Sequence, residues 1–326
     1  MSGTALAAGY VADLLLGDPR RLHPVAGFGQ LAQRAESAAY SPTRARGAAY
    51  AALLTGLAAG TGELAARAAT RAGANRSVVL ALVTWASLGG RSLTHEADRL
   101  ADHVRAGELD AARKTLPWLC GRDPQALGAD GLARAAVESV AENTSDAVIG
   151  ALLWGALGGP AGVIGYRAAN TLDAMVGHRS DRYRDFGWAA ARLDDLVSWP
   201  AARQTALLTA VCAPVVGGRF ATTWGTVRRD GARHPSPNGG RVEAAFAGAL
   251  GVRLGGPLVY AGVPELRPTI GDGRAPTAAD VRRATRLSLV VGAAGAVACS
   301  GARSLLGRPR RRARALLGRL RRRACA

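Results

Sequence analysis

The longest uncharged stretch of the chain, Ala147–Tyr166, is 20 residues long and is bounded by acidic segments. Twenty apolar residues are about what one α-helix needs to cross a bilayer. Glu138, Glu142 and Asp146 precede the stretch, and Asp173 follows it closely. Because ionisable groups are costly beside hydrocarbon, a cluster placed there marks a candidate functional site. The sequence therefore predicts a membrane span with a site at its water–lipid boundary.

Four further uncharged runs have 14 to 16 residues: Gly47–Gly62, Ser77–Gly90, Gln204–Gly218 and Leu287–Ala302. Runs of this length occur both in membrane segments and in buried helices of soluble proteins. Mean hydropathy is only +0.06, so an alanine-rich soluble helical bundle is the alternative. We predict an all-α, polytopic membrane bundle with about five spans and helical polar loops.

We expect one membrane-embedded domain over residues 1–305. It would contain a polar helical connector at about 92–137 and a polar loop at about 219–286. Residues 306–326 would form a separate basic tail. The segment Arg303–Ala326 holds ten arginines and no acid, more than half of the net charge of +18. Beside an apolar run, such a tail favours anionic lipid on the cytoplasmic side over nucleic acid, so we expect no nucleic-acid partner.

Glu138, Glu142 and Asp146 recur at intervals of four and would share one face of a continuous helix. Three like charges on one face repel, and Mg²⁺ is the usual compensating cation. The alternative is a helix boundary, with Asn143 to Ser145 as the cap and Asp146 in the first turn of the next helix. Both interpretations fit the residues.

Beyond the apolar stretch, Tyr166, Asn170 and Asp173 would share a helix face next to Arg167. The arginine-rich segment His178–Phe186 is either a solvated loop or a phosphate-binding segment, since paired arginines suit phosphate. Asp194 and Asp195 either offset a helix dipole or supply the second half of a metal site.

A later turn, His234-Pro-Ser-Pro-Asn238-Gly-Gly, has the residue types of a tight irregular turn. Its accessible backbone could cradle a phosphate. The chain has no Walker A pattern. The four cysteines are far apart and form no C-x-x-C pair, so neither a zinc site nor a disulfide framework is indicated.

Several of these motifs together resemble one known family, the adenosylcobinamide-phosphate synthases of cobalamin biosynthesis. The resemblance rests on motifs that occur in the expected order over about residues 5–305: Leu16-Gly-Asp18-Pro19 with His23-Pro24-Val25, Glu138–Asp146, Tyr166–Asp173, His234–Gly239 and Glu243–Gly256.

The resemblance implies a multi-pass enzyme of the inner (plasma) membrane. The enzyme would ligate adenosylcobyric acid to (R)-1-amino-2-propanol O-phosphate, or a related amino-alcohol phosphate, as an amide. It would use ATP as cosubstrate and Mg²⁺ as cofactor. Partners would be these two substrates, the lipid bilayer and other late cobalamin-pathway membrane enzymes.

Residue type and motif position then assign roles. For the catalytic set we predict Glu138, Glu142, Asp146, Asp173 and His234. Three of these carboxylates, Glu142, Asp146 and Asp173, would hold Mg²⁺. The expected substrate-binding residues are Asn143, Arg167, Asn170, Arg182 and Asn238. Arg167, Arg182 and His234 would bind phosphate or the corrinoid carboxylate, and the asparagines would orient substrate.

Two other function classes fit parts of the pattern. Asn170-x-x-Asp173 and Asp194-Asp195 resemble the carboxylate pairs with which prenyltransferases hold Mg²⁺-diphosphate. An intramembrane prenyltransferase would use an isoprenoid diphosphate and no ATP. A non-catalytic corrinoid-binding membrane scaffold would bind corrinoid without turnover.

Overall fold

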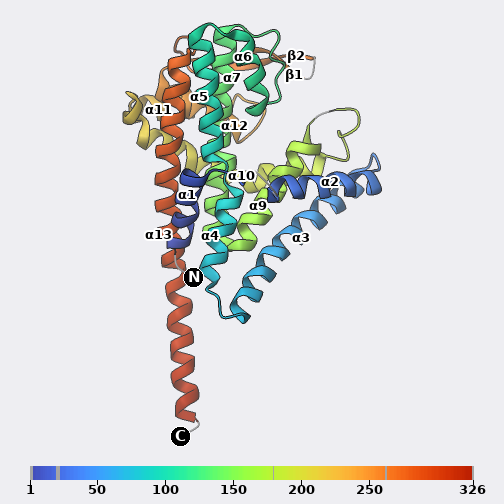
Figure 1. Cartoon of the computed structure of the whole chain (residues 1–326), viewed down its shortest axis with the longest axis vertical. Coiled ribbons are helices and arrows are strands. Elements are labelled where there is room, and N and C mark those ends of the chain that lie inside the picture. Colours follow the sequence, from blue (N-terminus) through green and yellow to red (C-terminus); the bar gives the residue numbers. More distant parts are fainter. Residues whose placement is uncertain (1–2, 20–22, 179, 261–262, 325–326) are drawn as a thin grey trace.

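The computed structural model describes residues 3–19, 23–178, 180–260 and 263–324. The chain is almost entirely helical, which confirms the predicted all-α class (Figure 1). The longest helix, α13 (Ala278–Ala324), runs along the long axis of the molecule and continues past the other elements at its C-terminal end. As far as Ala324, the backbone of the predicted basic tail is therefore a continuation of this helix.

The N-terminal half supplies the elements α1 (Thr4–Leu16), α2 (Pro24–Ala39), α3 (Arg44–Arg71), α4 (Arg76–Ser87) and α5 (Gly90–Ala106). Side-chain caps fix several of these starts. The Nδ1 atom of His23 accepts from the Val25 N–H at α2, and the Asn75 side chain accepts from the Ser77 N–H at α4. Helices α2 and α3 project from the main body as an arm (Figure 1).

The predicted polar connector is helical, as expected. It contains nearly all of α5, then α6 (Leu109–Thr115), a 3₁₀ turn (Leu116–Trp118) and the first part of α7 (Ala129–Asn143). Later elements are α10 (Trp188–Cys212), a 3₁₀ turn (Ala213–Val216), α11 (Phe220–Asp230) and α12 (Gly239–Leu250).

The 20-residue apolar stretch does not form one span, so that prediction was wrong. It contains the second half of a π-helical turn, η2 (Thr144–Ile149), then α8 (Gly150–Gly158) and the first half of α9 (Pro160–Leu172). Gly159 joins α8 to α9 with a φ of 66°, a backbone conformation that favours glycine. Pro160 then opens α9, where its missing N–H costs nothing. Helices α8 and α9 pack against each other as a hairpin.

Among the described residues, one helical segment is long and apolar enough to cross a bilayer, Ala278–Leu306 of α13. Only 28% of its apolar window is buried in the protein, so most of this surface is left for lipid or another partner. The count of about five spans remains a prediction.

The predicted polar loop at 219–286 is more ordered than expected. It contains α11 and α12 and an antiparallel hairpin of β1 (Leu254–Tyr260) and β2 (Val263–Ile270). The sequence did not indicate strands because Gly255, Gly256, Pro264 and Pro268 are poor strand residues. Both glycines have positive φ and lie at a register shift, and Arg134 of α7 donates to the carbonyl oxygens of Gly255 and Pro257 at 2.7 and 2.8 Å.

Three buried apolar clusters hold the elements together. The largest joins α5, α7, α10, α12 and α13, and a second joins α1, α4, α8, α9 and α13. The third packs the arm against residues 172–190 around Phe186. Helices α7 to α10, which carry most of the predicted site residues, are therefore fixed by packing on several sides.

The close approach within the α8–α9 hairpin gives a first prediction. A Cβ atom at Gly162 would stand 2.2 Å from the carbonyl oxygen of Trp154, whereas one at Gly158 meets no atom within 4 Å. Gly162→Ala should therefore destabilise the protein by about 1–3 kcal/mol through overpacking. Gly158→Ala, the matched control, should be neutral or slightly stabilising. Thermal unfolding of both variants in detergent measures the difference, and equal melting temperatures would contradict the hairpin.

Candidate functional site

Two π-helical turns lie at the two ends of the apolar stretch. Asp146 lies in η2, and Asp173 begins the second, η3 (Asp173–Gly177). The η2 turn is fixed by Thr144, whose Oγ1 is 2.6 Å from the carbonyl oxygen of Val140 and 2.7 Å from Ser288 Oγ of α13. Turns of this kind are frequent at functional sites, because the extra residue redirects side chains from the regular helix surface.

An aspartate cluster forms where the α8–α9 hairpin meets α10, and we define it as Asp146, Asp173, Asp194 and Asp195. The charge of Asp194 acts on both Asp146 and Asp173, and that of Asp195 acts on Asp173. The hairpin thus returns the chain, so that acids from both ends of the apolar stretch share one partner on α10.

Arg167 links this cluster by hydrogen bonds. Its NH1 group lies 3.3 Å from the carbonyl oxygen of Asp146 and 3.3 Å from Asn170 Oδ1. Asn170 in turn donates from Nδ2 to Asp194 Oδ1 at 3.3 Å, and Ser198 Oγ donates to the same oxygen at 3.2 Å. Arg167 and Asn170, both predicted site residues, are therefore next to Asp146 and Asp194.

The carboxyl group of Asp173 is in an unfavourable place for a negative charge. Burial raises its pKa to about 7, and the charges of Asp194 and Asp195 act in the same direction. Additional positive charge at the aspartate cluster would favour ionised Asp173.

A second group of ionisable side chains gathers around Glu142, just before the start of η2, and we call Glu142, His234 and Glu243 the glutamate cluster. One ligand atom of each lies within 4.8 Å of the others. The distance between His234 Nε2 and Glu243 Oε1 is 3.9 Å. Both atoms are buried and have no hydrogen-bond partner, and their side chains are 5% and 1% exposed.

The tautomer of His234 limits what this cluster can bind. The backbone N–H of Ser236 donates to His234 Nδ1 at 3.0 Å, so the neutral ring carries its proton on Nε2. Burial lowers the pKa of His234, and the charge of Arg267 lowers it further. Burial raises the pKa of Glu243 well above its usual value, with Glu142 and Glu138 adding to the shift. These groups suit proton exchange better than metal ligation through Nε2.

The His234–Gly240 turn connects the two clusters. Ser236 Oγ accepts from the N–H groups of Asn238 and Gly239 at 3.3 and 3.1 Å. Asn238 donates to the carbonyl oxygen of Asp195 at 2.8 Å and accepts from Arg203 at 2.8 Å. The side chain of Asn238 thus ties the turn to α10. Gly239 lies close to Glu142, because a Cβ there would be 3.3 Å from Glu142 Oε1.

Other predicted site residues have local partners. Glu138 is buried, pairs with Arg122 and accepts from the Gly255 N–H at 2.7 Å, so it fixes the start of the β-hairpin. Asn143 donates to the carbonyl oxygen of Ser139 at 3.0 Å. Arg182 lies in the segment that packs against the arm, where it pairs with Glu36 at 2.8 Å. The structure thus brings most predicted residues together but places Arg182 with α2.

Three residues outside the predicted set join the clusters: Asp194, Asp195 and Glu243. The sequence predicts that Asp194 and Asp195 either offset a dipole at a helix start or supply the second half of a metal site, and it marks Glu243 only as part of a motif. The helix-start placement is wrong, because both aspartates lie beyond the first turn of α10. The sequence signal for Asp194 was the Asp-Asp pair itself. Glu243 gave no separate signal, because nothing in the local pattern of α12 shows that its carboxyl group is buried against Glu142.

Comparison with known proteins gives a consistent result. The model of the CobD/Cbib protein family matches residues 6–288. The cobalamin biosynthesis protein CobD of Mycobacterium tuberculosis (strain ATCC 25618 / H37Rv) is 52% identical over 290 residues, 89% of this chain and 92% of that protein. The proteins of the same name from Geobacter metallireducens and Chromobacterium violaceum are 43% and 42% identical, over 87% and 88% of this chain and 91% and 92% of their own lengths. No solved structure matches the chain.

The buried carboxyl group of Glu243 gives a prediction with a definite sign. Because its folded pKa lies above the value of 4.5 for an ordinary glutamate, the native state binds more protons than the unfolded state above about pH 4.5. The free energy of unfolding should therefore fall as pH rises through this range. Glu243→Gln removes this contribution. The melting temperature of the variant relative to that of the wild type should therefore increase from pH 5 to pH 8.

Thermal unfolding at pH 5, 6.5 and 8 checks this expectation. Asp110→Asn, at a side chain that is 90% exposed and pairs with Arg113, serves as the control. A constant difference between Glu243→Gln and the wild type across the three pH values would show that burial does not hold the proton on Glu243.

Proposed function

The chain belongs to the CobD/Cbib family, and we propose that it is an enzyme of cobalamin biosynthesis with amide-ligating activity. It would join the carboxyl group of adenosylcobyric acid to the amine of (R)-1-amino-2-propanol O-phosphate, or a related amino-alcohol phosphate. The product would be adenosylcobinamide phosphate. The match over residues 6–288 and the names of the relatives support the pathway. The motifs of the sequence and the chemistry of the site support the reaction.

The observation that carries this proposal is the convergence of Asp146, Asp173 and Asp194. Four carboxylates in one partly buried place, with Arg167 and Asn170 beside them, repel one another, and a bound cation would relieve this repulsion. The donor set fits Mg²⁺, because it consists of carboxylate and amide oxygens and Mg²⁺ prefers oxygen ligands. Asp146, Asp173 and Asp194 would hold the ion. When bound, it would neutralise charge on the phosphate oxygens of ATP.

The remaining residues would position the reacting groups. A carboxylate has to be activated before an amine can displace oxygen from it, and ATP would supply the activating phosphoryl group. Arg167 is near the acids and would orient the corrinoid carboxylate or a phosphate. Asn170, held between Arg167 and Asp194, would fix the rotamer of both. Positioning and fixed charges of this kind supply much of the rate in such reactions.

A membrane location is part of the same proposal. The segment Ala278–Leu306 is long enough to span a bilayer and is mostly unburied. Large aliphatic side chains are exposed along α1, α3, α4 and α10, among them Leu15, Leu53, Leu64, Leu82, Leu196 and Val211. Exposed aliphatic surface on this scale is typical of a face that meets lipid or a partner. We therefore place the protein in the plasma membrane as a multi-pass enzyme.

The test compares variants of the aspartate cluster with a remote control. Asp146→Ala and Asp194→Ala should each lower the rate of corrinoid amidation by about 100-fold or more, the usual effect of removing a charge-stabilising group. Asp110→Ala, at an exposed acid of α6 that pairs with Arg113, should leave it near normal. The assay incubates membranes with adenosylcobyric acid, aminopropanol phosphate and Mg-ATP, and measures the product by mass spectrometry.

Three outcomes of this assay would count against the proposal. Near-normal turnover in both aspartate variants would contradict the proposed metal site at the aspartate cluster. Turnover of an isoprenoid diphosphate without ATP would indicate a prenyltransferase instead. Corrinoid binding without product in the wild type would indicate a scaffold.

A further inference from the structure

The turn that follows α1 carries a further acid, Asp18, whose charge acts on Arg167. The turn begins at Gly17, which has a φ of 68°, a conformation that favours glycine. Trp85 Nε1 of α4 donates to the carbonyl oxygen of Gly17 at 2.9 Å. This hydrogen bond fixes the backbone next to Asp18 against α4. No step of the proposed reaction uses Asp18 so far.

The carboxyl group of Asp18 also lies close to η2. A Cβ atom at Gly89 would be 3.9 Å from Asp18 Oδ2 and 3.7 Å from the Cβ atom of Ala147, the residue after Asp146. Asp18 and η2 therefore approach Gly89 from two sides. Because the charges of Asp18 and Asp146 both act on Arg167, a group bound at Asp18 would be near a group bound at Arg167.

A ligand can reach the carboxyl group of Asp18. Its side chain is 26% exposed, as is that of His23. His23 Nδ1 accepts from the Val25 N–H at 3.2 Å, so the neutral ring carries its proton on Nε2, which is 4.0 Å from Asp18 Oδ2. This distance is too long for a hydrogen bond. Among the described residues, no cation is therefore in hydrogen-bond contact with Asp18.

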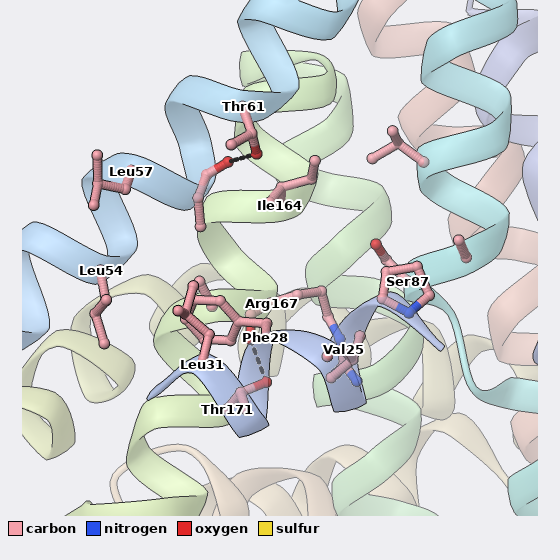
Figure 2. A pocket seen from close by; sticks show the side chains of 16 residues that line it. Val25, Phe28, Leu31, Leu54, Leu57, Thr61, Ser87, Ile164, Arg167 and Thr171 are labelled. Carbon is pink, nitrogen blue, oxygen red and sulfur yellow. Dashed lines mark hydrogen bonds between the residues drawn. The ribbon is translucent and has the colours of Figure 1, made fainter. Parts of the chain in front are cut away.

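The space beside Arg167 is a cavity of about 370 Å³ between α2, α3, α4 and α9 (Figure 2). Pro24 and Val25 at the start of α2 line this cavity together with Ser87 and Arg167. Figure 2 shows the Arg167 side chain extending from α9 toward Val25. The start of α2, which follows the Asp18 turn, and the arginine on which Asp18 acts thus border open space. A small substrate has room beside Arg167.

The opposite charges of Asp18 and Arg167 match one of the proposed substrates. The amino-alcohol phosphate has a basic amine and a phosphate separated by two carbon atoms, whereas adenosylcobyric acid and ATP have no basic amine. A primary amine is protonated near neutral pH, as the pKa of about 10.4 of a lysine side chain shows. An ammonium group and a carboxylate form a charge-assisted hydrogen bond, which is stronger than a neutral one. Asp18 is thus suited to the amine, and Arg167 to an anionic group.

We propose that Asp18 binds the amine of the amino-alcohol phosphate and holds it near the carboxylate or phosphate bound at Arg167. The inference rests on the proposed function, because the amine belongs to that substrate. An amine held next to the carboxyl group with which it reacts has a high effective concentration. Asp18 would also give specificity, since a compound without the amine would leave this carboxylate without a partner.

The test measures binding by the full chain in detergent, with Mg-ATP present and adenosylcobyric acid absent, so that no amide forms. Isothermal titration calorimetry compares (R)-1-amino-2-propanol O-phosphate with isopropyl phosphate, which has the same carbon skeleton and phosphate but no amine. The wild type should bind the amine compound about tenfold or more tightly, as expected for a hydrogen bond to a charged group. Asp18→Asn should lose this preference and keep its affinity for isopropyl phosphate within about twofold, because the lost contact involves the amine alone. Asp110→Asn, at the exposed acid of α6, is the control and should keep the preference.

Equal affinity of the wild type for the two compounds would overturn the amine site, and this measurement needs no variant. Equal weakening of both compounds in Asp18→Asn would also overturn it, because Asp18 would then support the fold rather than the amine. A wild type that prefers the amine compound but forms no amide in the membrane assay contradicts the proposed reaction and leaves the amine site standing. Amide formation by Asp18→Asn with an unchanged KM for the amine compound contradicts the amine site alone.

Discussion

The electrostatic balance around Arg167 is the constraint on which the arrangement of the site depends. Its guanidinium group is opposed by Asp18, Asp146 and Asp194, which come from three distant parts of the sequence. Removing charges from water is costly unless they are paired, and one arginine cannot pair fully with three acids. The protein maintains this imbalance because packing in the apolar clusters holds η2, α9 and α10 in place around Arg167. Such an excess of buried carboxylates is stable only with protons or an added cation.

The α8–α9 hairpin makes this meeting of acids possible. A continuous 20-residue helix is about 30 Å long, so it would hold the acids at its two ends on opposite sides of a bilayer. The sequence predicts both a single span and a site that contains Asp146 and Asp173, and these two predictions are incompatible. The break at Gly159-Pro160 resolves the conflict, because both ends of the apolar stretch then approach α10.

The sequence indicated which polar residues come together better than it indicated the path of the chain between them. Polar groups next to an apolar stretch are energetically costly, and this cost singles out Asp146, Arg167, Asn170 and Asp173 in the sequence. The structure places these residues around Asp194. The hairpin was missed because hydropathy counts charged residues and gives no weight to Gly-Gly-Pro inside an uncharged run. The β-hairpin was missed because its stability comes from the contacts of Arg134 and Glu138 with its backbone, which local propensity does not contain.

The aspartate and glutamate clusters offer different ligand atoms, so the two clusters suit different ligands. The aspartate cluster offers carboxylate and amide oxygens and suits a hard cation. In the glutamate cluster, the Ser236 N–H group occupies His234 Nδ1 and leaves Nε2 as a donor, so the ring faces Glu243 with a proton rather than a lone pair. Asn238 binds the carbonyl oxygen of Asp195 from the His234–Gly240 turn, which also lies close to Glu142. A shift of this turn would therefore change the positions of residues in both clusters.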